Sequence, residues 1–174
     1  MLIWFAFGFM CAAAVMLAAS YFKFASLRKA VLRAWLKLDA SLQNRRDLIP
    51  SVALSAAVLP ELERAFVYAL SNMQKPLSVS VSASKRSAQE AALSQSLKII
   101  FTSAQAHPEL MNDEHFSNLR QNIGKADKRI EADKKRYNSA VRDFNTLAEI
   151  VPLNLVANLL EFEEFEYFDF EKSI

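Results

Sequence analysis

Turn-forming residues are scarce in this sequence. It holds two glycines, five prolines and one cysteine in 174 residues. A sheet of many strands needs glycine or proline at many of its turns, whereas the abundant Ala, Leu, Lys, Glu and Arg favour long helices. Two glycines are too few for the usual glycine-rich phosphate loop or G-x-S-x-G elbow, and no H-E-x-x-H motif is present. We therefore predict an all-α fold, without these catalytic motifs and without a cofactor.

Charge is absent from the first part of the chain. Residues 2–22 form an apolar run that includes Cys11, the single cysteine, so neither a disulfide framework nor a thiolate metal site is available. As a helix the run reaches about 30 Å, the thickness of a bilayer's hydrocarbon core. A cleaved signal peptide carries its cations before the apolar run, but here they follow it, at Lys23, Arg28, Lys29, Arg33 and Lys37. We predict a retained transmembrane helix.

These five cations also predict an orientation. By the positive-inside rule, the domain after the apolar run lies in the cytoplasm and the N-terminus lies outside. The expected location is a bacterial inner membrane, either the cytoplasmic membrane or one derived from it. Binding of anionic headgroups by the same cations is a weaker alternative, because the anchor already holds the chain on the bilayer.

The rest of the chain shows helical periodicity. Apolar residues from Val31 to Ile49 continue the first helix into water, and Pro50 is expected to end or kink it. A second helix is expected from about Val52 to Met73. The serine-rich residues 75–87 are expected to be a connection rather than a strand, because they have no partner strand.

A third helix is expected to begin at Ser87, whose side chain would form a capping box with Glu90. The HPEL stretch at 107–110 would end it. A long helix follows, with Asn112 or Asp113 as its cap, and its apolar residues repeat every three or four positions, as in a coiled coil. That stripe comprises Phe116, Leu119, Ile123, Ala126, Ile130, Asp133, Tyr137, Ala140, Phe144, Leu147 and Val151.

Two charged positions interrupt otherwise apolar helix faces. Arg45 falls on the face of Leu38 and Leu42, and Asp133 is the one acid in the apolar stripe of the long helix. A buried guanidinium without a carboxylate costs several kcal/mol. We therefore predict a buried ion-pair network that fixes the register of the first and last helices. Asp133 is the candidate partner of Arg45, with Asp47 and Asp39 as local alternatives, and the competing interpretation is that Arg45 reaches water past its aliphatic stem.

Two other charged stretches receive structural interpretations. His107 and His115 flank three acids, but a turn followed by a helix start explains them better than a metal site does. The basic residues of 125–138 alternate with acids, as on a solvated helix face, so we expect no nucleic-acid binding.

The end of the chain differs in charge from the rest. Residues 1–160 contain 20 Lys and Arg against 13 Asp and Glu, whereas residues 161–174 contain one lysine and six acids alternating with aromatic residues. This period of two would suit an edge strand or an aromatic insertion into a partner's groove. Packing back on the chain's own bundle is favoured, because exposed aromatic side chains are costly.

The stretch LDASLQNRRDLIPSV at residues 38–52 is similar to a signature of the LemA family, with Leu42, Arg45, Asp47, Leu48, Ile49 and Pro50 matching. A second signature is matched at Pro108, Leu110, Phe116, Leu119, Arg129, Ile130, Tyr137, Asn138, Val141, Asn145, Leu147, Pro152, Ala157, Tyr167 and Phe168. Four positions depart from the family pattern: Asn44, Ser51, Asp133 and Glu161. The resemblance covers residues 28–168, although residues 53–105 match poorly.

This resemblance implies a single N-terminal membrane helix, an extended antiparallel helical bundle and no known catalytic activity. Some family members occur in the magnetosome membrane of magnetotactic bacteria, and others have been linked to envelope stress. The expected organisation is a transmembrane helix at 1–22, a cytoplasmic helical bundle at 23–160 and an acidic, aromatic tail at 161–174.

The expected function is a non-enzymatic scaffold that recruits partner proteins or organises the membrane. One alternative is a membrane-bound, metal-dependent hydrolase using the region of His107 and His115. Another is a self-assembling structural protein, which would be a homo-oligomer. The expected partners are the lipid bilayer and proteins that the sequence does not identify.

Overall fold

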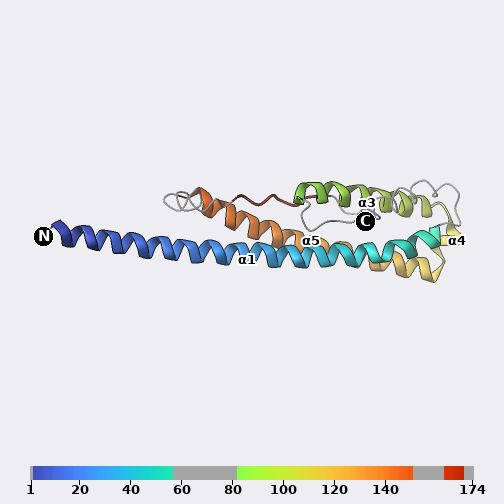
Figure 1. Cartoon of the computed structure of the whole chain (residues 1–174). Coiled ribbons are helices and arrows are strands. Elements are labelled where there is room, and N and C mark those ends of the chain that lie inside the picture. The colour runs from blue at the N-terminus through green and yellow to red at the C-terminus, as the bar shows by residue number, and fades with distance from the viewer. Residues whose placement is uncertain (1, 57–81, 151–162, 171–174) are drawn as a thin grey trace.

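A computed structural model shows an elongated bundle of helices (Figure 1). It describes residues 2–56, 82–150 and 163–170. The helices in this part of the chain are α1 (Leu2–Ala56), α3 (Ala83–Ala104), α4 (Pro108–Met111) and α5 (Glu114–Glu149). No strand occurs among these described residues, so the all-α prediction is confirmed.

Helix α1 is a single helix of 55 residues. Its first part extends beyond the bundle (Figure 1), and its large apolar side chains there are exposed; Ile3, for example, is 82% exposed. This segment is the one helix in the described residues that is long and apolar enough to cross a membrane. Its exposure distinguishes it from the core helix of a soluble protein, which would be buried.

The second part of α1 is a core element of the bundle. Helix α5 runs back along it in the antiparallel direction, and α3 packs beside them (Figure 1). The antiparallel arrangement expected for the first and last helices is therefore present.

Pro50 was expected to end or kink the first helix, and the first of these alternatives is wrong. Proline removes one backbone N–H and crowds the preceding turn, yet α1 continues through Pro50 to Ala56. Ile49 and Val52 on either side of it are buried in the core. Burial of the flanking apolar side chains stabilises the helix across the missing hydrogen bond.

The predicted start of the third helix is also wrong. Ser82, not Ser87, is the N-cap of α3, and its side chain accepts a hydrogen bond from the Lys85 N–H. Ser87 and Glu90, assigned to a capping box, are buried in the second turn of this helix. Helix α3 includes residues 83–87 of the expected connection, and the expected second helix lies outside the described residues except for its first turn, which belongs to α1.

The long last helix begins as predicted. Asp113 caps α5, since its side chain accepts a hydrogen bond from the Phe116 N–H. The predicted stripe is buried at most positions, but Asp127 and Val141 are buried where Ala126 and Ala140 were expected. Val151, the last member of the predicted stripe, lies outside the described residues.

The core has two apolar parts along the bundle. The part farther from the apolar segment of α1 contains Ile49, Val52, Leu93, Leu97, Ile100, Phe101, Ala104, Phe116, Leu119 and Ile123. The nearer part contains Phe24, Val31, Leu38, Leu42, Ile130, Tyr137, Val141, Phe144, Leu147 and Phe168. On α1 the boundary between the two parts falls at Arg45, and on α5 it falls at Asp127.

Candidate functional site

The boundary between the two apolar parts is a layer of charged side chains. Arg45 at its centre is fully buried. Its Nη2 lies 2.7 Å from Oε2 of Glu90 on α3, and its Nη1 lies 3.0 Å from Oδ1 of Asp127 on α5. Nη1 also donates a hydrogen bond of 3.0 Å to Oγ of Ser94. One guanidinium thus ties α1, α3 and α5 together, as a planar group with several donors can.

Two more arginines complete this layer. Arg46 pairs with the second oxygen of the Glu90 carboxylate, and Arg86 of α3 pairs with Asp39 of α1. Burial lowers the pKa of Arg86, and the carboxylates of Asp39 and Glu90 oppose that effect.

The layer therefore joins three arginines to three carboxylates, and its formal charge is balanced. Charges balanced in this way are tolerated in a core but stabilise it little. That they fix the alignment of the helices stays a prediction, which the Glu90 variants test.

The predicted partner of Arg45 is wrong, although the predicted network exists. Asp133 accepts a hydrogen bond of 2.7 Å from Ser41 and pairs with Arg136 at 2.8 Å, one turn along its own helix. Helical periodicity placed Arg45 and Asp133 on the right faces. It could not show which carboxylate lies at the same height as Arg45, because that depends on the axial offset between the two helices.

Both local alternatives are excluded as partners of Arg45 by what they contact. Asp47 is exposed and accepts a hydrogen bond from Gln43, and Asp39 pairs with Arg86. The interpretation that Arg45 reaches water is also wrong, since it is fully buried.

The described part of the acidic, aromatic tail, residues 163–170, packs back on the bundle, as favoured from the sequence. The side-chain amide of Asn138 bonds both the N–H and the carbonyl of Phe168, at 2.9 and 2.8 Å. Asn145 makes the same pair of bonds with Phe165, at 3.1 and 3.0 Å. Seven residues of helix span about 10 Å, as do three residues of extended chain. The two asparagines therefore match the spacing of the two phenylalanines.

Further contacts hold the tail on α3 and α5. Tyr137 donates a hydrogen bond from its hydroxyl to the Glu166 carbonyl, and the N–H of Asp169 donates one to Ser87. Phe170 lies with its ring centre 5.2 Å from Cζ of Arg45, a cation–π distance. The described part of the tail is thus in contact with the charged layer. Its Phe165, Phe168 and Phe170 side chains pack in the chain's own core, whereas Tyr167 is exposed.

Burial raises the pKa of Tyr137 from its ordinary value of 10.0 to about 12, and the nearby Glu166 carboxylate adds to the effect. Between these two pH values, the Tyr137 hydroxyl therefore keeps its proton in the folded state but has lost it in the unfolded state. The resulting stability is complete below pH 10 and is lost as the pH rises from 10 to about 12. We expect the free energy of unfolding to fall by about 2–3 kcal/mol over this range.

This pH effect can be measured by chemical unfolding of the detergent-solubilised chain at several alkaline pH values. Other tyrosines and lysines titrate in the same range, so the comparison is with Tyr137→Phe. An equal loss of stability in both proteins would contradict the assignment to Tyr137.

The structure also places the remaining predicted residues. Arg129 and Pro50 are exposed. The five cations after the apolar run are all exposed along α1: Lys23, Arg28, Lys29, Arg33 and Lys37.

His107 precedes α4, and His115 is exposed in the first turn of α5. Within residues 2–56, 82–150 and 163–170, no three His, Cys, Asp or Glu side chains gather as a metal site would require.

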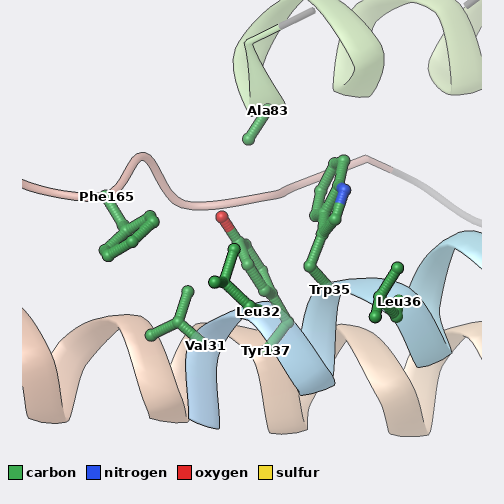
Figure 2. A pocket seen from close by; sticks show the side chains of 7 residues that line it. All are labelled: Val31, Leu32, Trp35, Leu36, Ala83, Tyr137 and Phe165. Carbon is green, nitrogen blue, oxygen red and sulfur yellow. The ribbon is translucent and has the colours of Figure 1, made fainter. Parts of the chain in front are cut away.

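Two cavities of about 400 Å³ flank α1. One is basic and is lined by Ala30, Arg33, Ala34, Lys37, Asp133 and Arg136. The other is apolar and is lined by Val31, Leu32, Trp35, Leu36, Ala83, Tyr137 and Phe165 (Figure 2). Figure 2 shows α1 along one side of this apolar cavity, with the tail and the start of α3 along the other.

Sequence reasoning missed five members of the buried network: Arg46, Arg86, Glu90, Ser94 and Asp127. The sequence could have indicated that Glu90 is buried, because it lies three and seven residues before Leu93 and Leu97 on one helix face. It was instead assigned to a helix cap. Asp127 gave a weaker signal, because the heptad pattern placed its neighbour Ala126 in the stripe. Asn138 and Asn145 were noted only for their match to a family signature.

The chain matches the model of a known protein family. The family model described as LemA family matches residues 34–174. That range begins within α1, after its apolar segment, and includes every residue of the charged layer. No curated protein matches the chain.

Proposed function

Because this chain belongs to the LemA family, we propose that it is a membrane-anchored scaffold without an enzymatic step of its own. The observation that carries this proposal is the continuity of α1. One helix provides an exposed apolar segment as long as a bilayer is thick and then becomes a core helix of the bundle. No flexible linker separates the two parts, so the anchor holds the bundle close to the lipid surface.

The exposed charges support an orientation with the bundle in the cytoplasm. Five cations follow the apolar segment on α1, and the first acid after it is Asp39. Cations within about 15–20 residues of a membrane helix favour the cytoplasmic side. The membrane we propose is a bacterial inner membrane or one derived from it. A role in magnetosome formation or in envelope stress is suggested by the family resemblance alone.

The proposed activity is recruitment of proteins or organisation of the membrane by the outer faces of the bundle. The described part of the tail contributes Glu163, Glu164 and the exposed Tyr167 to these faces, since its phenylalanines pack inward. A rigid bundle with exposed charged faces at a fixed distance from the lipid suits a scaffold.

The first test is membrane fractionation with protease protection. We expect the full chain to stay with membranes in alkaline carbonate and to need detergent for release. Protease added to spheroplasts should spare the bundle, whereas protease added to inverted vesicles should digest it. Replacement of Lys23, Arg28, Lys29, Arg33 and Lys37 by glutamine should lower the fraction with this orientation, while the same replacement of the distant cations Arg120, Lys125, Lys128, Arg129 and Lys135 should not.

Two results would contradict the proposal. Recovery of the intact chain in the soluble fraction would show that the apolar segment does not anchor it in a membrane. A stoichiometric metal ion in the purified chain that is lost in His115→Ala would favour the metal-dependent hydrolase over the scaffold.

A further inference from the structure

An apolar patch remains exposed on α1 outside the apolar run. Leu32 is 48% exposed and Leu36 is 65% exposed, and both line the apolar cavity of about 400 Å³ (Figure 2). Leu32 lies ten residues beyond Phe22, about 15 Å farther along a helix. The headgroup region adds only about 5–8 Å on each side of the hydrocarbon core, so in the proposed anchor this patch faces water rather than lipid. Water-facing apolar patches beside a cavity mark interaction sites.

The patch continues into the apolar segment on the same face of α1. Steps of seven residues, each of which turns about 20° around a straight helix, lead back from Leu32 to Ala25, Ala18 and Cys11. Ala18 and Cys11 are exposed, and Ala25 is half-buried. Small residues repeated on one face let membrane helices approach closely.

We propose that a second copy of this chain covers the patch, forming a parallel dimer along this face of α1. This inference rests on the proposed anchor, which gives all copies in one membrane the same orientation and confines them to two dimensions. In a symmetric parallel dimer, each residue of the face meets the same face of the other copy. Leu32 and Leu36 of each copy then enter the apolar cavity of the other.

Charge complementarity supports a second copy of the chain as the partner that covers the patch. The exposed Arg28 and Lys29 lie about one turn before Leu32 on α1, close in sequence to the lining residue Val31. The tail edge carries the exposed acids Glu163 and Glu164 next to Phe165. With α1 of one copy seated in the cavity of the other, these cations of each copy face the acidic edge of the other, which also relieves the repulsion between the two Lys29 side chains.

The native cysteine provides a direct test. Cys11 lies on the proposed face, and a disulfide forms only between cysteines whose Cα atoms come within about 7 Å. Copper-catalysed oxidation by O₂ of native membranes containing the full chain should convert the 19.6 kDa band into a band of twice that mass that reverts on reduction. The matched control is Cys11→Ala/Phe9→Cys, which moves the thiol two residues, to the opposite side of the helix at nearly the same depth, and should cross-link at least about tenfold less.

A second pair of variants tests the patch in water. Leu32→Glu/Leu36→Glu should reduce cross-linking at Cys11 by about tenfold or more, because it replaces apolar contact by like charges. Leu54→Glu, which changes a leucine that is 75% exposed near the other end of α1, should leave it unchanged. Both variants alter exposed side chains, so both should fold.

Several results would overturn the dimer. Equal cross-linking from Cys11 and from Phe9→Cys would indicate random collision, and a product of another mass would indicate a different protein on this face. If the chain remains in the membrane but does not cross-link, the proposed dimer is wrong and the proposed membrane anchor still holds. If the chain is found in the soluble fraction, both proposals are wrong.

Discussion

Glu90→Gln should lower the free energy of unfolding by about 3–5 kcal/mol, the cost of leaving a buried charge without its partner. Glu90 is fully buried, and its two carboxylate oxygens pair with Arg45 and Arg46. Glutamine keeps the shape of the side chain but removes the negative charge, so two buried guanidinium groups lose their shared counter-ion.

This loss is measured by urea unfolding of the detergent-solubilised chain. The fluorescence of Trp35 is a suitable signal, because its ring lies 5.2 Å from that of Tyr137 and 5.7 Å from the guanidinium of Arg86. Trp4→Phe removes the only other tryptophan. The matched control is Glu131→Gln, which breaks partly exposed pairs with Lys134 and Lys135 and should cost no more than about 0.5 kcal/mol.

A double-mutant cycle tests whether the pair itself is responsible. Arg45→Gln and Glu90→Gln should each be strongly destabilising. The combined variant should cost clearly less than their sum, because each single variant already breaks the contact between Arg45 and Glu90. Simple additivity, or a loss below about 1 kcal/mol for Glu90→Gln, would show that the layer does not control the alignment of the helices.

Phe168→Ala should cost about 3–5 kcal/mol and detach the tail from the bundle. Phe168 is fully buried, with its ring 5.8 Å from Trp35 and 5.6 Å from Phe170. Its backbone is also the segment that Asn138 bonds. Loss of the ring therefore removes both an anchor of the core and the contact that keeps these hydrogen bonds away from water.

The neighbouring residue supplies the control. Tyr167 is exposed, so Tyr167→Ala should change the stability by no more than about 0.5 kcal/mol. Limited proteolysis should cleave the tail of Phe168→Ala much faster than that of Tyr167→Ala. Equal cleavage rates would show that the inward and outward positions of the tail do not differ in their contribution.

The local elements followed from the sequence because their causes are local. The uncharged run of 2–22, the cap at Asp113 and the apolar repeat of the long helix depend on residues within a few turns of each other. The start of α3 was misassigned because Ser82 and Ser87 both suit a cap. Only the contacts of Ser87 with the tail and of Glu90 with two arginines excluded the second position.

The sequence by itself determined an all-α chain with one bilayer-length apolar helix and a charge on a buried face of the first helix. The tertiary structure decided that Arg45 meets Glu90 and Asp127, that α1 passes through Pro50, and that the tail lies on Asn138 and Asn145. The physical reason is that helical periodicity fixes the face on which a residue lies. The height at which two helices meet is set by the burial of both apolar parts of the core together with the pairing of every charge between them.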